Sequence, residues 1–292
     1  MSGSSTPSVP DHPVGFAVEP AWQGPVTQFD TRATPGFSGG KAQGAERLVA
    51  IDAELEDLQE RLFAAHHGTE GGRSVLLVVQ GMDTSGKGGI MRHVVGAVDP
   101  QGVDITAFKA PTATEKRYDF LWRIEPHAPA PGMIGVFDRS HYEDVLIHRV
   151  HGWADDAELA RRYDAINEFE HRLVDAGTEV VKVMLHISYE EQGERLAERL
   201  ARPDKHWKFN PGDIDERVLW PAYMDAYSRA LVATSTEAAP WHVVPADRKW
   251  YARIAVQQLL VDALRRIDPQ WPEADFDVAE QVARLEATRV LA

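Results

Sequence analysis

Residues 75–89 read VLLVVQGMDTSGKGG, and this stretch decides the fold. An apolar run at residues 75–79 leads into a glycine-rich turn, and a helical pattern begins near Ile90. A strand that is apolar on both faces has to be buried on both, which is typical of a parallel sheet covered by helices. The stretch therefore predicts an α/β fold that is built around this strand.

Four further β-branched, apolar runs follow, with helical patterns between them. The five predicted strands cover residues 74–80, 103–108, 133–137, 180–187 and 241–244. Strands that alternate with helices favour right-handed crossovers and one parallel sheet. We therefore expect a three-layer α/β sandwich with a five-stranded parallel sheet and helices on both faces.

Residues 46–66 are predicted to form a helix with an apolar stripe on one face. The stripe consists of Leu48, Ile51, Leu55, Leu58 and Leu62. Such a stripe has to be buried against another element, either in the core or at a subunit contact. Two later helix starts are indicated by capping boxes, Thr112-x-x-Glu115 and Ser188-x-x-Glu191.

The chain divides into three regions. Residues 1–45 are rich in proline and glycine without apolar periodicity, so we expect a flexible or surface-wrapping arm. Residues 36–40 match the G-x-S-x-G pattern of hydrolases, but the strand that this pattern requires does not precede them. The folded module is expected over residues 46–268, followed by a C-terminal helical tail at residues 269–292.

The turn after the first strand has the spacing G-x-x-x-x-G-K, which is typical of a phosphate-binding loop. Position 88 is glycine. At this position, P-loops that hydrolyse nucleotides have a serine or threonine whose hydroxyl binds Mg²⁺. Asp83 supplies a hard oxygen donor instead, and its charge next to phosphates calls for a bridging cation. The residues predicted to bind phosphate or nucleotide are Gly81, Met82, Thr84, Ser85, Gly86, Gly88, Gly89 and Arg92.

A second motif, Asp138-Arg139-Ser140, follows the third predicted strand. Because parallel strands end at the same edge of a sheet, Asp138 is expected beside the phosphate loop as a second metal-directed acid. Arg139 is placed to bind an anionic substrate, whereas a helix cap is the alternative interpretation of this motif. The predicted catalytic residues are Asp83, Lys87, Asp138 and Arg139, and the predicted metal ligands are Asp83 and Asp138.

A basic cluster lies in the long segment between the fourth and fifth strands. Residues 195–208 carry five basic and two acidic residues, although 31 Lys and Arg against 45 Asp and Glu give the chain a net charge of −14. The cluster fits a polyanion on a mobile lid at about residues 195–225, and a solvated helix face is the alternative. The predicted polyanion-binding residues are Arg195, Arg199, Arg202, Lys205 and Lys208.

The amino-acid composition argues against several classes of protein and partner. The acidic balance disfavours nucleic acid as a partner, and the absence of cysteine excludes disulfides and thiolate chemistry. Because no long apolar run or signal-peptide pattern is present, we expect a soluble, cytoplasmic protein without a membrane partner. Two weaker signals are His148 with His151 as zinc ligands, and Trp207, Trp220 and Tyr223 as base-stacking groups; hydrogen-bonded histidines and lid packing are the simpler interpretations.

The loop with Asp83 and Lys87, the Asp138-Arg139-Ser140 motif and the basic lid ending in residues 207–209 together resemble the polyphosphate kinase 2 family over about residues 46–268. The resemblance implies a P-loop kinase fold and Mg²⁺-dependent, reversible transfer of phosphate between inorganic polyphosphate and a nucleotide, with Mn²⁺ as a possible substitute metal. It also implies a homo-oligomer, a dimer or tetramer.

Residues 119–123 (DFLWR) and 140–146 (SHYEDVL) are similar to members of the family that accept AMP. Some relatives have asparagine in place of Asp138, which leaves phosphorylation of ADP open. The expected reaction is in-line phosphoryl transfer from polyphosphate to AMP, with charge neutralisation by Lys87 and Arg139. Two alternatives remain, an ATP-dependent kinase of a nucleotide or small metabolite and a non-catalytic polyanion sensor.

Overall fold

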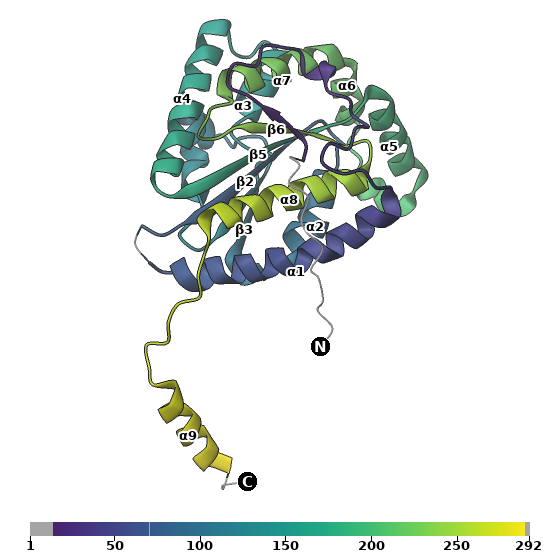
Figure 1. The fold of residues 1–292 in the computed structure, drawn as a ribbon. Coiled ribbons are helices and arrows are strands. Elements are labelled where there is room, and N and C mark those ends of the chain that lie inside the picture. The colour runs from purple at the N-terminus through teal and green to yellow at the C-terminus, as the bar shows by residue number, and fades with distance from the viewer. Residues whose placement is uncertain (1–13, 70, 290–292) are drawn as a thin grey trace.

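The computed structural model describes residues 14–69 and 71–289. A six-stranded sheet lies at its centre, with the order β1-β6-β5-β2-β4-β3 (Figure 1). The strands are β1 (Phe16–Val18), β2 (Ser74–Gln80), β3 (Val103–Ala107), β4 (Ile134–Asp138), β5 (Thr178–His186) and β6 (Trp241–Pro245). The five parallel strands predicted from the sequence are confirmed.

The sixth strand, β1, was not predicted, because it comes from the arm. It runs antiparallel to β6, with Phe16 opposite Val243. Val18 and Val26 are fully buried, so this part of the arm belongs to the core. Three residues among prolines and glycines are too few to show an alternating pattern of apolar and polar side chains. They form a strand because the edge of β6 offers them hydrogen-bond partners.

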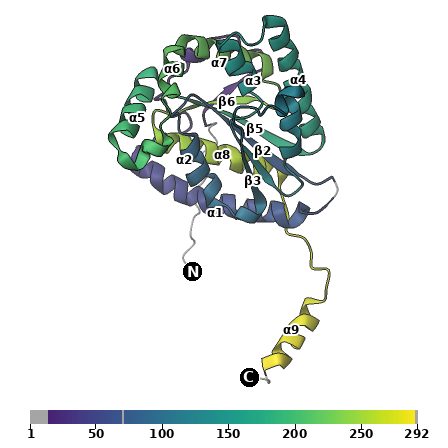
Figure 2. The same cartoon turned by 180° about the vertical axis from the view of Figure 1, so that it is seen from behind.

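Helices cover both faces of the sheet, as predicted (Figures 1 and 2). One face carries α1 (Lys41–His66), α2 (Lys87–His93) and α8 (Lys249–Ile267), and the other carries α3 (Glu143–Val150), α4 (Asp156–Asp175) and α7 (Trp220–Thr234). The apolar stripe of α1 packs against α8, and Ile51, Leu55 and Leu62 in it are almost fully buried. The stripe is therefore covered within the chain.

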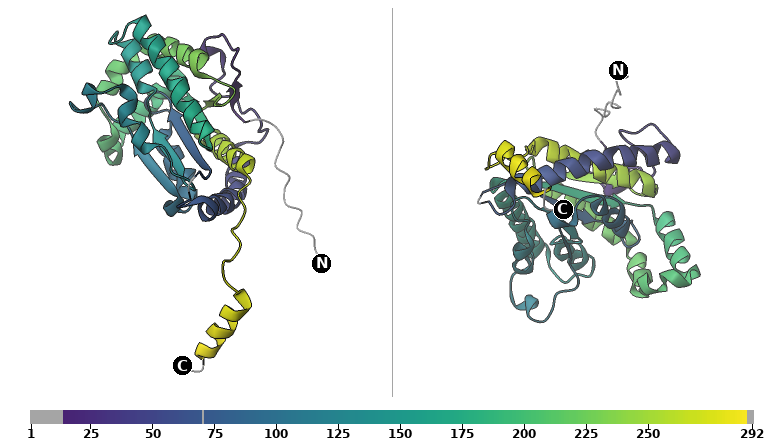
Figure 3. Two further views of the ribbon diagram at one scale, coloured as in Figure 1. Left: turned by 90° about the vertical axis from the view of Figure 1, so that its left-hand side faces the viewer. Right: turned by 90° about the horizontal axis from the view of Figure 1, so that it is seen from below.

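The segment between β5 and α7 projects from the body (Figure 3). It contains α5 (Tyr189–Ala201), the 3₁₀ helix Pro203–Lys208 and α6 (Gly212–Val218). The Ser188 side chain accepts a hydrogen bond from the Glu191 amide, so this predicted helix start is confirmed. Residues 220–225, which were expected within the lid, begin α7, and Tyr223 and Met224 are buried there.

The predicted helix start at Thr112 gives one turn of 3₁₀ helix, Glu115–Arg117, although both capping-box hydrogen bonds form. The other short 3₁₀ helices are Val26–Gln28, Val95–Ala97, Pro100–Gly102, Phe120–Arg123 and Glu125–His127. The tail ends in α9 (Val278–Thr288), which stands away from the body in Figure 1. Among the helices of residues 14–69 and 71–289, none is long and apolar enough to cross a membrane.

Candidate active site

The two predicted motifs meet at one edge of the sheet. Strands β2 and β4 are parallel neighbours, and Val79 in β2 lies opposite Asp138 in β4. The glycine-rich loop leaves β2 directly after this position, and Arg139 follows Asp138. The amide of Arg139 donates a hydrogen bond to the carbonyl oxygen of Val79 at 3.2 Å, so the second motif is tied to the strand that carries the loop.

The loop has a conformation that restricts its sequence. Gly81 and Gly86 have φ angles of 151° and 120°, and a Cβ atom on Gly81 would lie 2.7 Å from the carbonyl oxygen of Leu185. Two residues with side chains, Thr84 and Arg139, also have positive φ angles, of 65° and 64°. Such conformations are unfavourable for residues other than glycine, and they persist where the surrounding contacts determine them.

An ion pair joins the two motifs. The Arg139 guanidinium lies 2.9 Å from the carboxylate of Asp83, and both side chains are partly exposed. Burial acts to lower the pKa of Arg139, but the carboxylates of Glu143 and Asp83 outweigh it and raise the pKa. Arg139 therefore stays positively charged at the point where the loop and the strand end meet.

Two cavities adjoin this ion pair. The larger has a volume of about 460 Å³ and is lined by all four predicted catalytic residues, Asp83, Lys87, Asp138 and Arg139. The smaller, of about 210 Å³, also contains Asp83 and Arg139. The ion pair thus lies where the two cavities meet.

Lys87 lies at the base of the loop. Its Nζ atom donates hydrogen bonds to the carbonyl oxygens of Gly81 at 2.6 Å and Met82 at 3.3 Å. Burial lowers the pKa of this lysine, and the nearby carboxylate of Asp83 opposes the effect. The Thr84 and Ser85 hydroxyls are buried, and neither has a hydrogen-bond partner among the described residues.

The predicted lid residues have different environments. Arg195 is almost fully buried, and its guanidinium donates to Glu191 and to four carbonyl oxygens, those of Thr84, Ser85, Ala246 and Asp247. Every nitrogen of this guanidinium is therefore used within the protein, and Arg195 ties the phosphate loop to α5 and to the end of β6.

Arg199, Lys205 and Lys208 line the larger cavity. Arg202 does not line it; this side chain is exposed and pairs with Asp204 and Glu198. The predicted phosphate-binding residues Thr84, Ser85, Gly86, Gly88, Gly89 and Arg92 also line the larger cavity, whereas Gly81 and Met82 line the smaller one.

The sequence analysis missed several lining residues. Lys249 and Arg253, both on α8, add positive charge to the larger cavity. Burial and the neighbouring charge of Arg92 lower the pKa of Arg253, as expected for closely spaced cations. Nothing in the local sequence separates these residues from other basic residues at the start of a helix.

The smaller cavity is acidic and aromatic. The lining residues missed by the sequence analysis include Glu143, Asp213, Glu216 and Tyr227, and Tyr223, which was named only as a stacking group, lines it too. Burial raises the pKa of Glu143, although Arg139 and Lys87 oppose the effect. The Tyr223 hydroxyl donates to Glu216 at 2.6 Å, which connects α7 to the lid helix α6.

The weaker signals have structural explanations. His148 contacts Asp144 and Arg162, and His151 contacts Glu216 at 3.0 Å. Trp207 is 78% exposed, and neither it nor the partly buried Trp220 lines the two cavities. Within the described ranges, no group of three or more His, Cys, Asp and Glu residues is arranged to hold a metal ion.

The donor set at the loop nevertheless suits Mg²⁺. Asp83 and Asp138 line the same cavity, and both are partly exposed. Magnesium usually binds one or two carboxylates and completes its coordination with water and substrate phosphates. Two carboxylates without a third protein ligand are therefore consistent with a metal that is held jointly with a phosphorylated substrate.

Comparisons with known proteins agree with this geometry. A sequence profile described as Polyphosphate kinase 2 matches residues 39–272. An AMP/ADP-polyphosphate phosphotransferase from Meiothermus ruber is 42% identical over 260 residues, covering 89% of this chain and 96% of that protein. An ADP-polyphosphate phosphotransferase from Rhodopseudomonas palustris is 42% identical over 258 residues, covering 84% and 87%.

The fold is also shared with a solved structure. The crystal structure of polyphosphate kinase 2 from Arthrobacter aurescens superposes with a TM-score of 0.88 at 59% sequence identity, covering 94% of this chain and 99% of that one. The profile match spans strands β2 to β6, the phosphate loop and the lid. The chain therefore belongs to the polyphosphate kinase 2 family.

Proposed function

We propose that this protein transfers a phosphoryl group from inorganic polyphosphate to AMP, giving ADP, and to ADP, giving ATP, in a reversible, Mg²⁺-dependent reaction. The observation that carries the proposal is the pair of cavities that meet at Asp83 and Arg139. A phosphoryl transfer between two phosphorylated substrates needs two sites that share the reacting position. The curated relatives named above act on polyphosphate with AMP or ADP, which supports the same substrates here.

The larger cavity is the proposed donor site. Its basic side chains come from α2, the second motif, the lid and α8: Lys87, Arg92, Arg139, Arg195, Arg199, Lys205, Lys208, Lys249 and Arg253. A long polyanion has to be drawn to a protein of net charge −14, so these charges act locally, within a Debye length of about 10 Å. The side chains of Lys205, Lys208 and Lys249 would contact successive phosphates, and Arg195 would keep the loop in place.

The smaller cavity is the proposed entrance for the acceptor phosphate. Arg139 faces both cavities, so its guanidinium would orient the attacking oxygen while Lys87 neutralises charge on the donor side. The acceptor oxygen of a nucleotide phosphate is ionised at neutral pH, so the reaction needs no strong general base. Asp83 and Asp138 would hold Mg²⁺, which supplies neutralisation of the phosphate charge when bound.

The test is nucleotide chromatography after incubation with Mg²⁺ and long-chain polyphosphate. AMP and ADP are supplied in separate reactions, and ATP replaces polyphosphate as donor in a third reaction with AMP. We expect ADP from AMP, ATP from ADP, and dependence of both on polyphosphate. Turnover with ATP alone would instead support an ATP-dependent kinase, and binding without turnover under every combination would support a polyanion sensor.

A further inference from the structure

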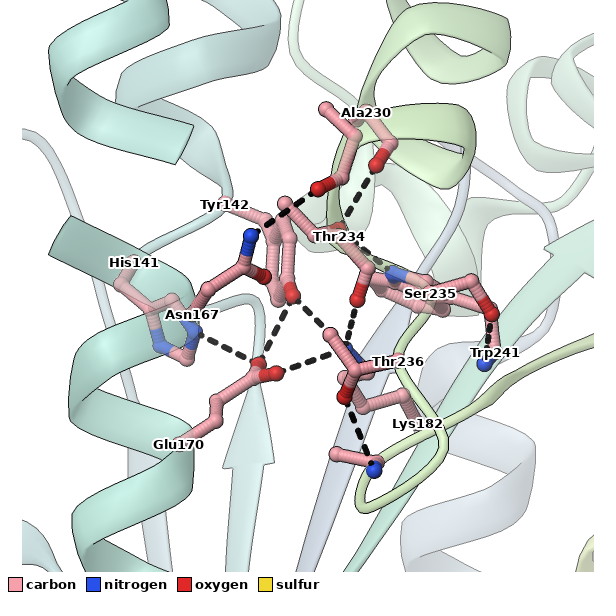
Figure 4. A network of polar contacts seen from close by, with 12 residues as sticks. His141, Tyr142, Asn167, Glu170, Lys182, Ala230, Thr234, Ser235, Thr236 and Trp241 are labelled. Atoms are coloured by element: carbon pink, nitrogen blue, oxygen red, sulfur yellow. Dashed lines mark hydrogen bonds and ion pairs between the residues drawn. The ribbon is translucent and has the colours of Figure 1, made fainter. Parts of the chain in front are cut away.

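A charged group lies inside the core, away from both cavities. Lys182 is in β5, at the middle of the sheet, and its side chain is 0% exposed (Figure 4). On the same face of the sheet, Met184 of β5 and Leu76 and Val78 of β2 belong to one buried apolar cluster. An apolar side chain would be the ordinary residue at such a position.

The lysine has three polar partners. Its Nζ atom donates to Glu170 Oε2 at 2.6 Å, to the hydroxyl of Tyr142 at 3.1 Å and to the carbonyl oxygen of Thr234 at 2.6 Å. These three hydrogen bonds match the three donors of an ammonium group. Burial lowers the pKa of Lys182, and the carboxylate of Glu170 opposes the effect. The Nζ atom also lies 5.6 Å and 5.3 Å from the ring centroids of Tyr142 and Trp241.

Glu170, in α4, is the centre of the network. Its Oε1 atom accepts from the Tyr142 hydroxyl at 2.7 Å and lies 3.3 Å from His141 Nε2, as Figure 4 shows. Burial acts to raise the pKa of Glu170, but Lys182 and His141 outweigh it, so the pKa lies below its usual value. The carboxylate thus holds two consecutive side chains, His141 and Tyr142, which are themselves fully buried.

These two residues follow the second motif directly. Asp138 is the last residue of β4, and Arg139 and Ser140 connect it to His141 and Tyr142. The amide of Tyr142 also donates to Ser140 Oγ at 3.2 Å. Arg139 has a φ angle of 64°, which a residue with a side chain keeps only where its neighbours determine it.

Stability alone does not explain the pair. Replacing a buried ion pair with apolar residues of similar size is often neutral or stabilising, because the desolvation of two charges is costly. This pair is hydrogen-bonded to the residues that follow the second motif. Orientation of that motif therefore explains the pair better than stability does.

We propose that Lys182 and Glu170 are positioning residues for phosphoryl transfer. They hold His141 and Tyr142, and through them they fix the backbone that aims Arg139 at Asp83 and directs Asp138 into the larger cavity. Neither residue lines either of the two cavities at the site, so they act through the motif and not on substrate. The inference rests on the proposed role of Asp138 and Arg139 in transfer.

The first experiment measures kcat and KM for Glu170→Gln and Tyr142→Phe at a temperature at which each variant is folded. Both changes keep side-chain volume and remove hydrogen bonds to the network. We expect kcat to fall by about 10-fold in Glu170→Gln and about 5-fold in Tyr142→Phe, with each KM within about 3-fold, because displacement of reacting groups impairs the transfer step. An unchanged kcat in both variants overturns the proposal.

The second experiment separates positioning from stability. Lys182→Met leaves an unpaired carboxylate in the core, so its Tm should fall, whereas Lys182→Met/Glu170→Leu removes both charges and should regain most of the Tm. A positioning pair predicts that kcat stays low in the double variant, because His141 and Tyr142 have lost their anchor. Recovery of kcat together with the Tm overturns the proposal and assigns the pair a purely structural role.

Two reference variants complete the design. Leu62→Ala, in the buried stripe of α1 on the other face of the sheet, should lower the Tm and leave kcat within about 2-fold, which shows that lost stability alone does not slow transfer. Arg139→Ala tests the site itself. A wild-type kcat in Arg139→Ala would overturn the assignment of the transfer site, and the inference with it, independently of how the network variants behave.

Discussion

At the scale of single residues, the site depends on a few charged side chains with specific surroundings. Asp83 follows β2, Arg139 follows β4, and the two form an ion pair across the boundary of two cavities. Lys87 is held against the loop by the carbonyl oxygens of Gly81 and Met82. In the proposed transfer, these contacts would hold the charges in place, so that little reorganisation is needed when phosphate charge develops.

Lys87→Ala should lower kcat by about 10² to 10³-fold, because it removes a principal electrostatic contact with the transferring phosphate. The measurement is the initial rate of ADP formation from AMP at saturating polyphosphate and Mg²⁺. Arg202→Ala, which removes an exposed cation outside the cavity, serves as the matched control and should keep the wild-type rate. A Lys87→Ala enzyme with near-wild-type kcat would contradict the assignment of this loop.

At the scale of elements, the lid carries two kinds of basic residue that look alike in the sequence. Arg195 is buried and holds the phosphate loop, whereas Lys205 and Lys208 line the cavity from the 3₁₀ helix Pro203–Lys208. Helix α5 therefore supports the loop through Arg195, whereas Arg199, near the end of the same helix, lines the larger cavity together with the 3₁₀ helix that follows.

Arg195→Lys should lower the free energy of unfolding by about 2 to 3 kcal/mol, because lysine cannot satisfy the carbonyl oxygens that the guanidinium now contacts. Urea denaturation measures the loss. Arg202→Lys is the control, and it should change the free energy of unfolding by no more than about 0.5 kcal/mol, since its partners are exposed. Equal effects of the two changes would show that the loop does not depend on Arg195.

Lys205→Ala should raise the KM for polyphosphate several-fold and leave the KM for AMP nearly unchanged, because Lys205 lines only the larger cavity. Steady-state kinetics at low and at high salt test this expectation. The effect should shrink at about 1 M salt, where the Debye length falls to about 3 Å. A rise in the KM for AMP instead would place the acceptor in the larger cavity.

At the scale of the whole molecule, stability depends on pH through two histidines in the sheet. Burial lowers the pKa of His186, at the end of β5, and of His242, in β6, to about 4. The unfolded chain binds these protons near pH 6.5, whereas the folded protein does not bind them until about pH 4. Their contribution to stability is therefore complete above pH 6.5 and is lost as the pH falls toward 4.

The free energy of unfolding should decrease between pH 6.5 and 4.5 by up to about 1.4 kcal/mol per pH unit for each histidine. Urea denaturation at several pH values measures this slope. The variant His186→Gln/His242→Gln carries neutral side chains at both positions and should show a shallower dependence over the same range. The same slope in both proteins would assign the acid sensitivity to other groups.

Much of the fold and of the site follows from short stretches of sequence. Three features could be predicted because each is set by residues that are neighbours in the sequence. They are the apolar run before the loop, the spacing of its glycines and the position of Asp138 at the end of a strand. The edge strand β1 could not be predicted, because three residues become a strand only when β6 offers them a partner. Lys249 and Arg253 were missed for the same reason, since their relevance comes from the position of α8 beside the loop.

The order of residues along the chain determined the sheet, the phosphate loop and the second acidic motif, because backbone conformation and apolar periodicity are properties of neighbouring residues. Only the tertiary structure decided which basic residues of the lid face the cavity and which are bonded within the protein, since Arg195 is buried against backbone carbonyl oxygens whereas Lys205 and Lys208 line the cavity. It also brought Lys182 and Glu170 together behind the second motif. Burial and long-range contact depend on how separate elements pack, and no local pattern records them.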